Sequence, residues 1–241
     1  MDAAAAAHEA VTGDPVADLT LYHAAPSRSS GVLILLDELG ADYRIQLLDI
    51  QAGDQHKADY LAINPLGKVP AIRHGDAIVT EQVAIYVYLA DLHPKARLAP
   101  AIGDPLRGPY LRWVAFYGSC FEPALVDRSM KREPAARAIS PYADFDTMLG
   151  ALLAQLEAGP WLLGERFSAA DVLWGSALGW TTRFQLLPMA PAIERYLARF
   201  DARPAVQRAR ARDAEMAARQ PPREARRVRP TSLRCSAPSC R

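Results

Sequence analysis

Two short segments of the sequence carry groups suited to holding a peptide-like ligand. Pro70 stands at the start of a strand-like run. A cis Val69–Pro70 bond would turn the N–H and C=O of Val69 outward, where a ligand could pair with them as an added strand does. The alternative is an ordinary trans proline at a strand edge. Glu81 and Gln82 open the next helical pattern, whose free N–H groups attract a carboxylate. Glu81 could receive an ammonium group, or only complement the positive end of the helix.

The elements that must position these groups follow the order β-α-β-α-β-β-α. Gly75-Asp76 is a strong signal for a two-residue hairpin turn between the last two strands. This order predicts a mixed sheet with helices on both faces. The expected strands are Leu19–His23, Tyr43–Ile50, Val69–His74 and Ala77–Val79, and the expected helices are Gly31–Gly40, Lys57–Ile63 and Glu81–Leu92.

Beyond a proline-rich stretch the chain shows only helical patterns, so we predict an α/β domain followed by an all-α domain. The expected helices are Tyr110–Val126, Ala143–Ala158, Ser168–Phe184, Ala192–Ala202 and Pro204–Arg219. The expected division is a disordered N-terminal extension (1–16), the α/β domain (17–93), a linker (94–109), the helical domain (110–218) and a disordered basic tail (219–241).

Composition excludes several classes of function. The 241 residues contain no apolar run long enough for a membrane span, so no membrane partner is expected. The net charge of +1 is unevenly distributed, because the tail from Arg219 onward has seven arginines and one glutamate. The rest of the chain is mildly acidic, which argues against nucleic acid as a partner. Three cysteines without metal-type spacing predict no metal site and a cytoplasmic location.

The stretches NPLGKVPAI (Asn64–Ile72) and TEQVAIYVYLAD (Thr80–Asp91) resemble the N-terminal domain of the glutathione S-transferases, especially the bacterial beta-like and theta-like groups. This resemblance implies a thioredoxin-like domain, glutathione as co-substrate, and a homodimer. It implies that Pro70 is cis and that Val69 pairs with the cysteinyl backbone of glutathione. Glu81 and Gln82 would hold the γ-glutamyl end, although many members have serine in place of Gln82.

Two further residues are candidates for the glycyl carboxylate of glutathione. His56 and Lys68 have the right charge, and the alternative is that both are solvated surface groups.

The resemblance places the group that activates the glutathione thiol in the loop after the first strand. A hydroxyl donor beside the sulfur would stabilise the thiolate of a thiol that otherwise titrates near ~8.5. No cysteine lies near this loop, which excludes a cysteine-type mechanism. Ser27 is our first choice, Ser29 the second and Tyr22 the third; the alternative is that the serines only cap the next helix. Arg28 would either add positive potential near the thiolate or point to solvent.

Two patterns in the helical part have structural interpretations. SAADVLWG (Ser168–Gly175) resembles the family's central helix, with Ser168 and Asp171 spaced as a capping box. Trp113, Phe116 and Tyr117 would border a second-substrate pocket or, as we favour, form a core stripe.

The function expected from the resemblance is conjugation of glutathione to small hydrophobic electrophiles, as in detoxification. Glutathione-dependent reduction of peroxides or disulfides is a related activity on the same fold. The alternatives are a non-catalytic glutathione-binding or protein-interaction module and a translation-factor-like or stress-response module, because a fold by itself does not determine function.

Overall fold

One four-stranded sheet organises the first part of the chain. The computed structural model describes residues 18–133 and 135–219, so the predicted N-terminal extension and nearly all of the predicted tail lie outside it. The strand order β2-β1-β3-β4 has β1 parallel to β2 and antiparallel to β3, which is antiparallel to β4. The mixed sheet is therefore confirmed. The strands are β1 (Leu19–His23), β2 (Arg44–Leu47), β3 (Ala71–His74) and β4 (Ala77–Val79).

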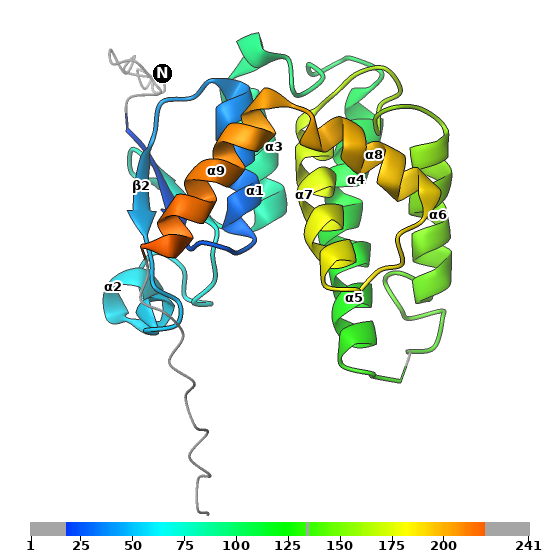
Figure 1. The fold of residues 1–241 in the computed structure, drawn as a ribbon, viewed down its shortest axis with the longest axis horizontal. Helices are drawn as coiled ribbons and strands as arrows, with labels where there is room; N and C mark the ends of the chain where they lie inside the picture. Colours follow the sequence, from blue (N-terminus) through cyan, green and yellow to red (C-terminus); the bar gives the residue numbers. More distant parts are fainter. Residues whose placement is uncertain (1–17, 134, 220–241) are drawn as a thin grey trace, which may run out of the picture.

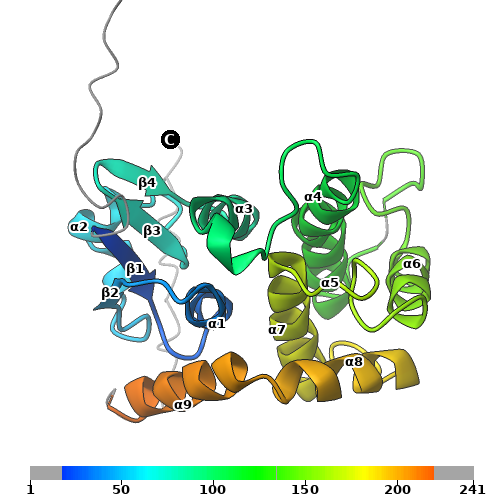
Figure 2. The ribbon, with the colours of Figure 1, turned by 90° about the horizontal axis from the view of Figure 1, so that it is seen from above.

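Helices cover both faces of this sheet, as predicted (Figure 2). α1 (Ser29–Leu39) and α3 (Gln82–Leu92) lie on one face, and α2 (Ala58–Leu61) with the short 3-10 helix η1 (Asp54–His56) lies on the other. Alternation along β1 separates the two faces: Leu21 is buried in the main core, whereas the ring of Tyr22 packs 5.7 Å from that of Tyr60. Gly40 ends α1 with φ 63°, the left-handed cap expected of glycine.

The second part of the chain is helical, which confirms the predicted fold class. A π-helical turn, η3 (Tyr117–Phe121), interrupts the predicted long helix and joins α4 to α5. The sequence did not predict this turn, which shifts the face that the following residues present. After the 3-10 helix η2 (Pro94–Ala96), the helices are α4 (Arg107–Phe116), α5 (Glu122–Ser129), α6 (Phe145–Glu157), α7 (Ala169–Arg183) and α8 (Pro191–Asp201).

α7 is the centre of the helical part. Trp174 is fully buried and donates from Nε1 to the carbonyl of Trp113 at 2.9 Å. Trp113 and Tyr117 are almost fully buried, so the aromatic stripe is mainly core, as we favoured. The capping box at the start of α7 is present. Burial raises the pKa of Asp171 to about 6, although its carboxylate accepts several hydrogen bonds that favour the charged form.

The last helix, α9 (Pro204–Ala218), lies along α1 rather than within the helical part (Figures 1 and 2). Arg203 holds the Glu38 carboxylate of α1 through two hydrogen bonds of 2.6 and 2.8 Å, and Arg212 lies 2.5 Å from Asp37. α9 therefore ties the last described residues to the first domain. Within the described ranges, no helix is both long and apolar enough to cross a lipid bilayer.

Candidate functional site

Three chain segments meet at the carboxyl end of β1. The register pairs Tyr22 with Ala71, so the loop that follows β1 lies beside Val69 and Pro70. The Val69–Pro70 bond is cis, as the resemblance implied. The side-chain amide of Gln82 donates to the Arg28 carbonyl at 3.3 Å, which brings the start of α3 to the same loop. The structure thus gathers most of the predicted site residues in one region.

The turn before Val69 is held rigidly. Asn64 donates from Nδ2 to the Lys68 carbonyl at 2.8 Å. Gly67 has φ +60°, and a Cβ there would lie 2.9 Å from the His56 ring, so both its conformation and its surroundings require glycine. His56 and Lys68 are exposed and flank this turn. Their side chains are therefore accessible to an anionic ligand group beside Val69.

The start of α3 is open to a ligand. Glu81 precedes the helix with φ 64° and ψ 119°, a conformation that non-glycine residues rarely adopt, and its side chain is exposed. No side chain caps this helix. The free N–H groups and the carboxylate can together receive an amino-acid end. The Gln82 amide also faces the helical domain, because the Tyr117 hydroxyl lies 3.1 Å from Gln82 Oε1.

The loop after β1 presents its two candidate serines differently. Ser27 is partly exposed, whereas Ser29 is fully buried. Their hydroxyl oxygens lie 2.7 Å apart, and Ser27 Oγ also accepts the Ser29 N–H at 3.1 Å. Ser27 Oγ therefore accepts the first N–H of α1, although the N-cap residue is Arg28 and has no side-chain cap bond. Ser27 is also partly accessible to solvent. The Tyr22 side chain lies on the face of the sheet that α2 covers, whereas α1 covers the other face.

Behind Ser29 lies a polar chain that sequence reasoning missed. Ser29 Oγ is 2.7 Å from Nδ1 of His23, a fully buried residue. The other ring nitrogen, Nε2, is 2.9 Å from Oδ1 of Asp213 on α9. These two atoms are close but not aligned as a hydrogen bond, so the contact is electrostatic. No local pattern connects Asp213 with the first strand, so their contact could not be predicted from the sequence.

Arg28 turns toward the helical domain, and 44% of its side chain remains exposed to solvent. Its guanidinium donates to both carboxylate oxygens of Glu122, at 2.8 and 2.6 Å, and lies over the Trp180 ring at 5.0 Å. The Tyr117 hydroxyl also donates to Glu122. Burial, followed by the charge of Glu122, raises the pKa of Tyr117 well above its ordinary value. Tyr117 is therefore a neutral donor, and Arg28 is already paired.

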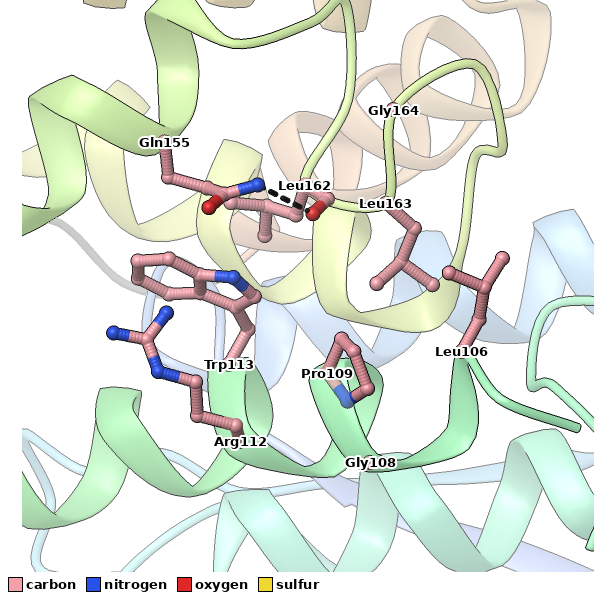
Figure 3. Close-up of a pocket in the computed structure, with 9 residues that line it drawn as sticks. All are labelled: Leu106, Gly108, Pro109, Arg112, Trp113, Gln155, Leu162, Leu163 and Gly164. Carbon is pink, nitrogen blue, oxygen red and sulfur yellow. Dashed lines mark hydrogen bonds between the residues drawn. The ribbon is translucent and has the colours of Figure 1, made fainter. Parts of the chain in front are cut away.

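A separate pocket of about 630 Å³ is lined by α4, α6 and the segment that leads to α7. Figure 3 shows Arg112 over Trp113 and, on the opposite wall, the hydrogen bond of 2.9 Å from Gln155 to the Leu162 carbonyl. A second pocket, of about 380 Å³, lies between β2 and α2. The first pocket contains none of the predicted site residues, and the second contains only Tyr22, our third choice for the thiol contact. Neither pocket contains Val69, Glu81, Gln82 or the two serines, so neither is the candidate glutathione site.

The comparisons with known proteins agree with this geometry. Residues 17–91 match the family described as glutathione S-transferase, N-terminal domain, and residues 143–204 match the corresponding C-terminal domain. The chain is 30% identical over 201 residues to the disulfide-bond oxidoreductase YfcG of Escherichia coli, covering 78% of this chain and 92% of that protein.

Solved structures give the same result. A glutathione transferase from Methylococcus capsulatus has a TM-score of 0.70 at 33% identity, covering 82% of this chain and 99% of that one. A sphingomonad glutathione S-transferase complexed with glutathione has a TM-score of 0.67 at 32% identity, covering 81% and 98%. Since both domain types match in order and full-length relatives align over most of their length, the chain belongs to the glutathione S-transferase family.

Proposed function

We propose that this protein is a glutathione transferase that uses the Ser27 hydroxyl to stabilise the glutathione thiolate for attack on small hydrophobic electrophiles. The observation that carries this proposal is the convergence of the Ser27 loop, the cis Val69–Pro70 turn and the open start of α3. A ligand bridging these segments would pair its backbone with Val69 and place its amino-acid end at Glu81 and Gln82. Its sulfur would then lie toward the loop after β1.

Accessibility favours Ser27 over Ser29 as the group that meets the sulfur. Ser29 is fully buried, and its oxygen already accepts the Ala24 N–H at 3.1 Å. Ser27 is partly exposed and can donate to a ligand while accepting from Ser29. A hydroxyl aimed at a developing thiolate stabilises charge without becoming charged itself.

His56 and Lys68 remain our candidates for the glycyl carboxylate, because both are exposed beside the turn before Val69. The electrophile would lie near Trp180 and the Arg28–Glu122 pair, where the two domains meet. We also propose a cytoplasmic homodimer, for which the support is the family and the few cysteines.

Disulfide reduction is the second candidate activity, and its support is the similarity to a disulfide-bond oxidoreductase. In that reaction the glutathione thiolate would attack a disulfide sulfur and release one thiolate. A second glutathione would then attack the mixed disulfide, which gives oxidised glutathione and the second thiol. Both activities need the same stabilised thiolate, so they share the site and differ in the electrophile.

The experiment is a kinetic comparison of Ser27→Ala with the unaltered protein. A lost charge-assisted hydrogen bond of about 1.5–3 kcal/mol lowers kcat/KM roughly 10- to 150-fold. Chlorodinitrobenzene and a small dialkyl disulfide serve as the two electrophiles. Tyr22→Phe is the matched control, since it removes a hydroxyl from β1 at a residue whose ring packs against Tyr60 of α2.

The thiolate absorbance of bound glutathione, followed against pH, gives an independent test. The unaltered protein should lower the pKa of the bound thiol below ~8.5, and Ser27→Ala should restore it. An unshifted thiol in the unaltered protein would favour the non-catalytic binding module.

A further inference from the structure

A buried chain of polar groups runs from α9 to the loop after β1. It consists of Asp213, His23, Ser29 and Ser27, with successive contacts of 2.9, 2.7 and 2.7 Å. His23 and Ser29 have no exposed surface, and the Asp213 side chain is 14% exposed. Ser27, at the far end, is partly exposed in the loop that lies beside Val69 and the start of α3. The chain therefore connects a buried imidazole and its carboxylate with the place where the thiol would sit.

We propose that His23 accepts the proton of the glutathione thiol through Ser29 and Ser27, and that Asp213 stabilises the imidazolium that results. This inference rests on the proposed function, because it needs Ser27 beside the sulfur. His23 and Asp213 do not touch the substrate and act through the two serines. A buried histidine that only joins β1 to α9 is the alternative role.

The transfer balances without any other reactant. Before it, neutral His23 carries its proton on Nε2, facing the Asp213 carboxylate, and the Nδ1 lone pair accepts from the Ser29 hydroxyl. Ser29 passes its proton to Nδ1 and takes the Ser27 proton, while Ser27 takes the proton from sulfur. One S–H bond breaks and one N–H bond forms. A thiolate and an imidazolium remain, and Ser27 now donates to the thiolate.

The groups around the His23 ring suit a positive charge on the imidazolium. Asp213 is the charged group that the structure places against the His23 ring, and the opposite nitrogen faces Ser29 of α1. Two arginines that precede Asp213 on α9 are paired elsewhere, Arg210 with Asp201 and Arg212 with Asp37. The Asp213 carboxylate is therefore free to close onto an imidazolium. In this shielded position the attraction between the two charges is stronger than in water.

Where the proton goes can be measured directly. Calorimetry of glutathione binding near neutral pH, repeated in buffers with different ionisation enthalpies, counts the protons released on binding. If His23 keeps the thiol proton, the thiolate absorbance appears while the heat does not depend on the buffer. NMR of the histidine ring nitrogens should show His23 becoming protonated when glutathione is added.

Two variants interrupt the chain at different points. Ser29→Ala separates Ser27 from His23, and Asp213→Asn removes the compensating charge. Both should raise the pKa of the bound thiol, by about 1 to 3, and lower kcat roughly a hundredfold with little change in the glutathione Kd. Glu157→Gln is the matched control, since it removes an exposed carboxylate of α6 that pairs with Arg195 of α8 and not with α9.

The outcomes distinguish this inference from the proposed function. A full proton released to the buffer, with thiolate formed and His23 unchanged, overturns the proton transfer and leaves the role of Ser27 intact. Unaltered thiol titration in Asp213→Asn overturns the role of Asp213. Absence of thiolate in the unaltered protein overturns both. The NMR and buffer measurements use the unaltered protein, so they decide the question even if a variant fails to fold.

Discussion

Replacing Glu81 with glycine should stabilise the fold while weakening glutathione binding. Glu81 has φ 64° and ψ 119°, which lies outside the left-handed well that asparagine or aspartate tolerates. Holding a side chain there costs about 1–3 kcal/mol. Glycine relieves this strain but adds about 0.5–1 kcal/mol of chain entropy to the unfolded state. The net gain is about 0–2.5 kcal/mol, which corresponds to a rise in Tm of up to several degrees.

The same substitution removes the carboxylate that we assign to the ammonium group of glutathione. Loss of one charge-assisted contact costs about 1.5–3 kcal/mol, or roughly 10- to 150-fold in Kd. Stability and affinity should therefore change in opposite directions. This is the behaviour of a residue held under strain for binding and not for folding.

Thermal unfolding and calorimetric titration with glutathione measure the two effects, and two further variants separate them. Glu81→Gln keeps the strained backbone and loses only the charge, so its Tm should stay close to the original while its affinity falls. Arg97→Gly changes another exposed residue with positive φ, 57°, well inside the left-handed well. It should add some stability and leave affinity unchanged.

Unchanged affinity in both Glu81 variants would refute the site assignment. A Glu81→Gly protein that is less stable than the original would show that the backbone there is not strained, because only the entropy cost of glycine would remain.

Three other predictions address the core, the turn and the assembly. Asp171→Ala should destabilise the fold by about 3–5 kcal/mol in chemical denaturation, because the buried N–H groups of Leu162 and Ser168 lose their acceptor; a loss below about 1 kcal/mol would contradict this. Gly67→Ala should lower the free energy of unfolding by about 2 kcal/mol and weaken glutathione binding, since the alanine Cβ would meet the Gln55 carbonyl at 2.9 Å. A variant as stable as the original would show that the turn can relax. Light scattering should give about twice the mass of the chain, and a monomer that still conjugates glutathione would rule out the need for a dimer.

Local patterns in the sequence were enough to predict the framework of the site. The strand-like runs, the Gly75-Asp76 hairpin and the helix beginning near Glu81 each depend on neighbouring residues, and all are present. The capping box of Ser168 and Asp171 was readable for the same reason. The family resemblance added the cis bond before Pro70, which base rates alone did not favour.

Tertiary structure decided the remaining features, because they join residues that are distant in the sequence. Whether Ser27 or Ser29 is accessible depends on how the start of α1 packs, and the two serines look alike in the sequence. The pairing of Arg28 with Glu122 requires the two domains to meet. The contact between His23 and Asp213 exists only because α9 returns to lie along α1. Spacing in the sequence specifies which face of an element is apolar, but not which distant polar group that face will meet.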